Sequence, residues 1–111
     1  MKIAVLFLFI ALSGTALSQL VDGPIVTDKR QLTSTIGFKL IDNNEGVLFY
    51  ELSVDRTGKV TSATLVKEGT TVISTPTKIK VRNHLMQFKF EAGTHYPEFH
   101  KVKVKVTTAK Q

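Results

Sequence analysis

The side chains best suited to bind a metal in this 111-residue chain are three histidines in its C-terminal half, His84, His95 and His100. A helical zinc pair needs two histidines four residues apart, whereas His95 and His100 are five apart across a segment that contains Pro97. No carboxylate is placed as a third ligand. The histidines are therefore interpreted as structural or surface residues, and the sequence predicts no metal.

Groups for nucleophilic or acid–base catalysis are also poorly placed. The chain has no cysteine and no G-x-S-x-G elbow that would expose a serine nucleophile. Glu51 and Asp55 are four residues apart around a strand end, where Asp55 is better explained by turn chemistry than as half of an acid pair. No glycine-rich phosphate loop is present. The sequence predicts a protein that is not an enzyme and needs no cofactor.

A β-hairpin between Gly46 and Val66 is the clearest structural signal. Val47 to Val54 is almost wholly apolar or β-branched, which is typical of a strand covered on much of both faces. Asp55 to Gly58 supplies a turn, and Val60 to Val66 reads as a half-buried returning strand.

A helix follows the hairpin. Ser74 or Thr75 can cap it and Pro76 suits its first turn, so it should begin there and end near Gln87. Its apolar face is predicted to hold Ile79, Arg82, Leu85 and Met86, and the next residues expected in the core are Phe88 and Phe90.

The last strand, from about Glu98 to Thr107, has an alternating pattern that gives its two faces different side chains. One face carries His100, Val102, Val104 and Val106, and the other carries Phe99, Lys101, Lys103 and Lys105. Lysines on an outer strand discourage edge-to-edge aggregation, so we expect this strand to form an edge of the sheet.

These elements predict an α+β fold: a small three-stranded antiparallel sheet in the connection β-β-α-β and the order 2-1-3, with one helix packed on one face. The domain is expected over residues 46–107, followed by a tail over 108–111. Residues 19–45 are interpreted as a lead-in. Leu32, Ile36 and Leu40 are spaced for a short helix there, although extended structure fits nearly as well.

The first eighteen residues resemble a secretory signal peptide. Lys2 precedes an apolar run from Ile3 to Leu12, and Ala16 to Ser18 offers small residues for cleavage. The alternative is a retained membrane anchor, but the run is shorter than the roughly 20 residues that a spanning helix needs. We therefore expect a periplasmic or secreted protein with no membrane span after cleavage. The absence of cysteine from an exported chain of this size favours a bacterial envelope.

Positive charge is concentrated in the last third of the chain. Residues 19–77 hold six Lys or Arg and seven Asp or Glu, whereas residues 78–111 hold eight and two. Neither a recognition helix nor an aromatic stacking platform accompanies this charge, so nucleic acid is not expected as a partner.

The motifs of residues 46–107 together resemble the C-terminal domain of the TonB family of bacterial envelope proteins. The resemblance rests on Gly46, the turn Val54-Asp55-Arg56-Thr57-Gly58-Lys59-Val60, Gly69, the capped helix start Ser74-Thr75-Pro76, and Phe88-Lys89-Phe90. It implies a domain that binds a peptide segment of an outer-membrane TonB-dependent receptor through its final strand. The proline-rich spacer and retained membrane helix typical of a full transducer are not seen, so the resemblance implies recognition without energy coupling.

The sequence thus predicts that an extended, acidic peptide adds to the final strand. The residues expected to bind this partner are Phe99, Lys101, Val102, Lys103, Val104, Lys105 and Val106. Two alternatives remain: a secreted inhibitor or accessory subunit of an envelope enzyme, and a homodimer formed by an open edge strand.

Overall fold

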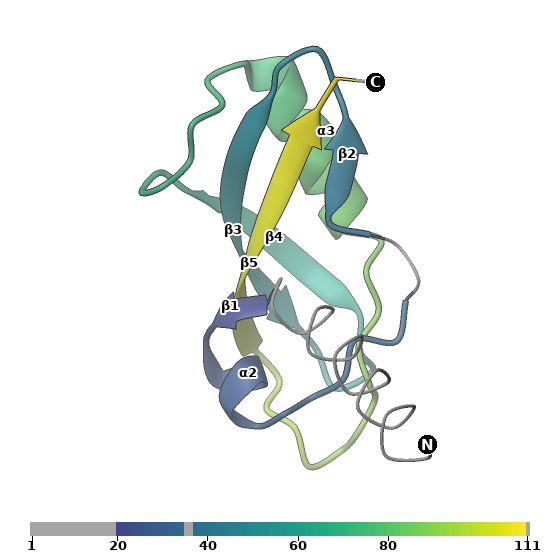
Figure 1. Cartoon of the computed structure of the whole chain (residues 1–111). Helices are drawn as coiled ribbons and strands as arrows, with labels where there is room; N and C mark the ends of the chain where they lie inside the picture. The colour runs from purple at the N-terminus through teal and green to yellow at the C-terminus, as the bar shows by residue number, and fades with distance from the viewer. Residues whose placement is uncertain (1–19, 35–36, 111) are drawn as a thin grey trace, which may run out of the picture.

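Five strands form one open sheet in the computed structural model, which describes residues 20–34 and 37–110. In chain order the elements are β1 (Leu20–Asp22), α2 (Pro24–Thr27), β2 (Lys39–Ile41), β3 (Gly46–Val54), β4 (Val60–Val66), α3 (Thr75–Leu85) and β5 (His100–Ala109) (Figure 1). The expected α+β class is confirmed. The expected signal peptide lies outside the described residues.

The prediction of a three-stranded sheet is wrong because two short strands extend it. The predicted trio is present in the predicted order, as β4-β3-β5, with antiparallel pairing throughout. β1 then pairs antiparallel with β5, and β2 pairs parallel with the far end of β5. Both added strands come from the lead-in, whose described residues, 20–34 and 37–45, contribute β1 and β2 to the sheet.

Residues 32–34 and 37–40, the described part of the stretch considered as a helix, are not helical. The helix of the lead-in is α2, a single turn at Pro24–Thr27, whereas Leu32 forms an isolated bridge with Phe90 and Leu40 lies within β2. Ile36, the middle residue of the proposed helical stripe, lies outside the described residues. Long-range pairing with β5 and with the Phe90 segment therefore outweighs the weak local preference for a helix.

The turn between β3 and β4 follows the predicted chemistry. The Asp55 carboxylate accepts hydrogen bonds from the backbone N–H groups of Thr57 and Lys59 at 2.9 and 3.1 Å and from the Thr57 hydroxyl at 2.6 Å. Gly58 has φ +90°, and a Cβ at this position would overlap the carbonyl of Phe90. The turn therefore needs glycine both for its conformation and for the close approach of the Phe90 segment.

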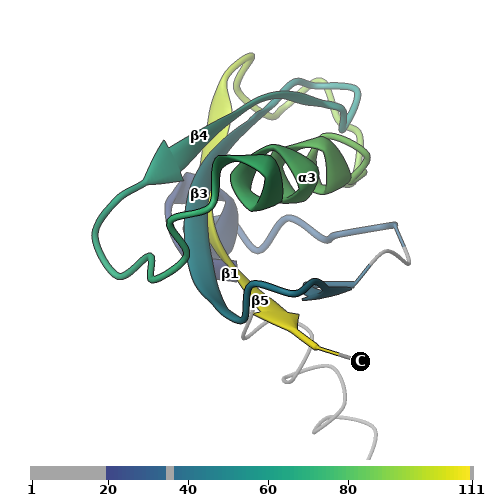
Figure 2. The same ribbon diagram turned by 90° about the horizontal axis from the view of Figure 1, so that it is seen from above.

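Helix α3 packs on one face of the sheet (Figure 2). Ser74 caps it by accepting a hydrogen bond from the Thr77 N–H at 3.4 Å, and Pro76 lies in the first turn, as predicted. The predicted apolar face is wrong in part. The residues buried from α3 are Thr77, Val81 and Leu85, whereas Ile79 keeps 53% of its surface exposed.

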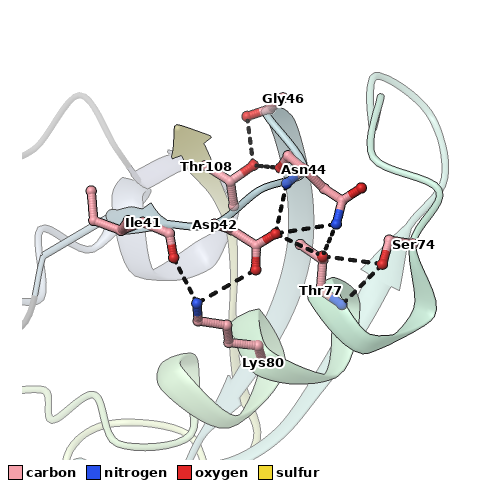
Figure 3. Close-up of polar contacts among 8 residues, drawn as sticks. All are labelled: Ile41, Asp42, Asn44, Gly46, Ser74, Thr77, Lys80 and Thr108. Atoms are coloured by element: carbon pink, nitrogen blue, oxygen red, sulfur yellow. Dashed lines mark hydrogen bonds and ion pairs between the residues drawn. The ribbon is translucent and has the colours of Figure 1, made fainter. Parts of the chain in front are cut away.

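Thr77 can occupy a core position because its hydroxyl is satisfied there. It donates to Asp42 Oδ1 at 3.0 Å and lies 3.2 Å from the Ser74 hydroxyl (Figure 3). The buried face of α3 therefore includes Thr77 and differs from the face predicted from the apolar residues alone. Phe88 and Phe90, both predicted core residues, are 0% and 3% exposed.

Candidate functional site

The final strand is not an edge of the sheet, and the sequence-based prediction of its position is wrong. β5 pairs along its length with β3 on one side, from Val54 opposite His100 to Gly46 opposite Thr108. On the other side it pairs with β1 at Lys103 and Val104, and with β2 from Thr107 to Ala109. Both flanks of the strand that was expected to receive a peptide are therefore occupied within this chain.

The side chains of β5 nevertheless divide as the alternation predicted. Val102, Val104 and Val106 are completely buried, while Lys101, Lys103 and Lys105 lie on the opposite face of the sheet from α3. Lys101 Nζ lies 3.9 Å from a Glu51 carboxylate oxygen, and Lys103 Nζ lies over the Phe49 ring at 5.0 Å.

Phe99, just before the strand, is 67% exposed. The seven predicted partner-binding residues are therefore split between the core and a solvated face, and they do not line one docking edge.

A buried arginine holds the lead-in against β5. Arg30 is only 1% exposed, and its guanidinium donates to the backbone carbonyls of Glu91 and Asp55, both at 2.7 Å. It also contacts His100 Nδ1 at 3.2 Å and lies over the Tyr96 ring at 4.1 Å. Burial lowers the pKa of Arg30, although nearby Tyr96 and the carboxylates of Asp55 and Glu91 oppose that effect.

His100 completes this cluster by bridging Arg30 to Asp28. Its ring is fully buried, and Nε2 lies 2.8 Å from Asp28 Oδ2. A neutral ring with its proton on Nε2 accepts from Arg30 and donates to Asp28, which satisfies both nitrogens. His100 therefore has a structural role, consistent with the interpretation drawn from the sequence. The role of Arg30 was missed, because a single arginine between polar residues carries no sequence signal of burial.

The other added strand, β2, is contacted by α3 at one end of its outer side. The Lys80 ammonium donates to the carbonyl of Ile41 at 2.6 Å and lies 3.4 Å from Asp42 Oδ2 (Figure 3). One turn later, His84 Nε2 is 2.6 Å from the carbonyl of Gly37, two residues before β2. Side chains of the helix thus fasten both ends of the β2 segment.

The loop after β2 is fastened to the start of α3 by Asp42. One carboxylate oxygen accepts from the Asn44 backbone N–H at 2.8 Å and from the hydroxyl of Thr77 at 3.0 Å (Figure 3). The backbone hydrogen bond from Asn44 is the main reason that the pKa of Asp42 lies below its ordinary value, with Thr77 contributing further. Every oxygen of this carboxylate has a partner inside the chain, so the cluster is a structural clasp.

The two ends of the strand order are β1, with three residues, and β4, with seven, and β4 pairs with β3. Its first residues are covered, because Phe90 N–H donates to the Gly58 carbonyl at 2.8 Å and Lys59 forms a bridge with Lys89. From Ser62 to Val66 no second strand follows within residues 20–34 and 37–110. We call this stretch, Ser62–Val66, the open edge.

The direction of the backbone groups on the open edge follows from its neighbours. Val47 and Phe49 direct their N–H groups to the hydroxyls of Thr71 and Thr70, which lie beyond the end of β4, so these two residues face the β4 side. Because backbone groups alternate along a strand, residues 62, 64 and 66 face β3, while Ala63 and Leu65 face outwards. The open edge therefore presents the N–H and C=O groups of Ala63 and Leu65.

The side chains of the open edge are uncharged. Ser62 and Thr64 are exposed on the face opposite α3, Leu65 and Val66 are half-buried, and Ala63 keeps 7% of its surface exposed beneath the helix. A bulge at Thr61 shifts the register at the covered end of β4. No charged residue or proline interrupts Ser62 to Val66, although natural edges usually carry such protection.

Metal ligands and membrane spans were also sought in the described part of the chain. Residues 20–34 and 37–110 contain no group of three or more His, Asp or Glu side chains that could hold a metal ion. Within the same residues, none of the helices has the length and apolar character required to cross a bilayer.

Comparison of the chain with protein-family models, with curated proteins and with solved structures gave no match.

Proposed function

We propose that this chain is a non-catalytic, exported binding domain that captures an extended segment of a partner protein by strand addition at β4. The proposal keeps the mechanism expected from the sequence and moves it from β5 to the strand whose flank is free. A peptide paired with the open edge would exchange main-chain hydrogen bonds with Ala63 and Leu65 and would extend the sheet beyond β4.

The observation that carries this proposal is an uncharged edge on the longest of the outer strands. β1 and β2 have three residues each and lie on the β5 flank, whereas β4 has seven residues and keeps the open edge along five of them. Since an unused edge invites aggregation, a secreted domain that leaves one edge bare is best explained by a partner that covers it.

The resemblance of residues 46–107 to the TonB C-terminal domain supports an envelope partner such as an outer-membrane TonB-dependent receptor. In that role the chain would act as an accessory recognition domain in the periplasm. An envelope enzyme held by the same edge is the alternative partner, and the two differ in what becomes cross-linked to β4.

A proline at position 65 tests the site. The Leu65 N–H faces outwards, so Leu65→Pro removes a donor that β3 does not use, and an edge strand can accept this change. Thr64→Ala is the matched control, because residue 64 pairs with β3 and its exposed side chain adds little to packing. Leu65→Lys is a second variant that keeps the backbone donor and places a protective lysine at the edge.

The readout is photo-cross-linking in envelope extracts from a probe residue at position 62. We expect a partner to be captured by the parent chain and by Thr64→Ala, and to be lost from Leu65→Pro and Leu65→Lys when circular dichroism shows both to be folded. Unchanged capture by the two folded Leu65 variants would refute the β4 site. A receptor as the captured protein supports the TonB-type role, and a hydrolase supports the alternative.

A further inference from the structure

The surroundings of the open edge are rich in positive charge. No Asp or Glu occurs from Gly69 to Phe90, a stretch that includes all of α3 and holds Lys78, Lys80, Arg82 and Lys89. Of these four, Lys80 alone forms an ion pair within the described residues, with Asp42. The layer that covers the sheet beside β4 therefore carries cations without internal counter-charges.

The two sides of α3 face different parts of the sheet. Lys80 and His84, one turn apart, face β2, where they contact the carbonyls of Ile41 and Gly37. The core residues Thr77, Val81 and Leu85 point to the sheet. Helical spacing then places Lys78 and Arg82 on the opposite flank from Lys80 and His84, which is the flank towards β4.

The contact of Tyr50 with the helix agrees with this placement. The Tyr50 hydroxyl, which donates to the Lys78 carbonyl at 2.6 Å, comes from β3, the strand beside β4. Burial raises the pKa of Tyr50, and the charge of Arg82 acts against that rise. Arg82 itself is exposed.

The ends of the open edge are positive as well. At its start the exposed lysines 59 and 89 lie side by side through their backbone bridge, and at its end Lys67 follows directly after β4. Glu68 and Glu91 are the acids nearest to these lysines in the sequence, and the Glu91 carboxylate accepts a hydrogen bond from the Tyr96 hydroxyl at 2.9 Å.

We infer that the segment bound at β4 is an acidic extended polypeptide, with its carboxylates on the side of the added strand that faces α3. The inference rests on the proposed strand addition at β4 and specifies the partner. Residues of the added strand that lie beside Ala63 and Leu65 point towards the helix layer, where Lys78 and Arg82 can pair with them. The alternate residues of the added strand lie beside Ser62 and Thr64, which favour small polar neighbours.

A second copy of this chain fits the open edge less well. An antiparallel pairing of β4 with itself about Ala63 would match Ser62 with Thr64, which is favourable. The same pairing brings Lys67 of each copy towards the Lys59–Lys89 end of the other, twice by symmetry, and brings two acid-free helices together. Charge complementarity therefore selects an acidic partner over self-association.

Three peptides of roughly nine residues, the length of a long strand, test the inference with the isotopically labelled protein. Every second residue is threonine or valine in all three peptides. The residues between them are glutamate in the first peptide, glutamine in the second and lysine in the third. We expect the glutamate peptide to shift the amide resonances of Ala63 and Leu65 and to bind about tenfold or more tightly than the glutamine peptide, with the difference lost at high salt.

Charge-removing variants identify the cations. The double variant Lys78→Gln/Arg82→Gln should bring the affinity for the glutamate peptide down to that for the glutamine peptide. The matched control Lys101→Gln/Lys103→Gln removes the same charge from the opposite face and should preserve the preference for glutamate.

The outcomes separate the two proposals. Shifts at Ala63 and Leu65 with equal affinity for the glutamate and glutamine peptides would overturn the acidic partner and leave strand addition standing. If the protein sediments as a dimer and these two amides are protected, the acidic partner would be overturned in favour of a second copy of the chain. No shift at β4 with any peptide would overturn the proposed function itself.

Discussion

Replacing Arg30 by methionine should destabilise the protein strongly, because Arg30 is a buried donor that many acceptors share. The methionine side chain keeps most of the aliphatic volume and loses every hydrogen bond. The Glu91 carbonyl and the Nδ1 atom of His100 then lack the donor that serves them now, whereas the Asp55 carbonyl keeps only the Gly58 N–H at 3.0 Å. The Tyr96 ring also loses the cation above it.

The magnitude follows from these losses. Each buried acceptor left without a donor costs about 1–3 kcal/mol, and loss of the cation–π contact costs about 1 kcal/mol more. Removing the buried charge relieves its desolvation cost, which offsets part of that sum. We expect a net loss of about 3–5 kcal/mol, the range for removing one partner from a buried charged network. A small domain is stable by only about 5–15 kcal/mol, so the loss is a large share of the total.

Urea unfolding followed by circular dichroism measures this change, with Lys39→Met as the matched control because Lys39 is exposed on β2. The control should alter the free energy of unfolding by less than about 0.5 kcal/mol. Near native conditions, Arg30→Met should also expose the amide protons of β5 that face β1, because the anchor of the lead-in is lost. A loss below about 1 kcal/mol would show that the Arg30 cluster does not hold the lead-in in place.

Three further predictions concern the edge, the turn and the clasp. Hydrogen exchange of the free protein should be faster at the outward Leu65 amide than at the Thr64 amide, which pairs with β3, and equal protection would contradict the assigned strand direction. Gly58→Ala should lower the free energy of unfolding by more than about 1 kcal/mol, since the added methyl group overlaps a backbone carbonyl and φ is positive, and thermal denaturation measures it. The hydrogen bonds that hold the carboxyl pKa values of Asp42 and Asp55 below their ordinary range stabilise the fold above about pH 4, and this contribution is lost as the pH falls through the lowered values. Lowering the pH should therefore reduce the free energy of unfolding of the parent chain more than that of Asp42→Asn. The same dependence on pH in both proteins would show that Asp42 does not contribute.

The hairpin, the helix and the last strand could be predicted because each carries a local signal. β3 and β4 begin and end within about one residue of their expected limits, and the cap at Ser74 was found from its residue type. The last strand is shifted, running from His100 to Ala109. Its end lies in the expected tail, because pairing with β2 carries the strand past Thr107.

The two short strands could not be predicted from the sequence, for a physical reason. β1 and β2 have three residues each, too few for an alternation to be recognised, and they are strands only because β5 pairs with them. The anchor that fixes β1 is equally non-local. Arg30 is 61 residues from Glu91 and 70 residues from His100.

The missing strands changed the interpretation of charge. Three lysines on a strand at the end of the chain suggested an edge protected against aggregation. With β1 and β2 in place, β5 is an inner strand and these lysines lie on a solvated face, so they protect no edge. The strand that does form an edge, β4, has no charge between Ser62 and Val66, and its cations lie beside it on α3 and at its two ends.

The lead-in therefore decides which flank of the sheet is open. Without β1 and β2 the hairpin, helix and last strand would have two free edges, one at β4 and one at β5. Arg30 and the Asp42 clasp hold β1 and β2 on the β5 flank and leave β4 as the longest outer strand. A partner at β4 would then lie below the acid-free helix, and this arrangement restricts the register and the charge of what can bind. A variant that releases the lead-in should accordingly bind acidic peptides at two edges. Its preference for glutamate should then depend less on Lys78 and Arg82, because the second edge, β5, carries Lys101, Lys103 and Lys105.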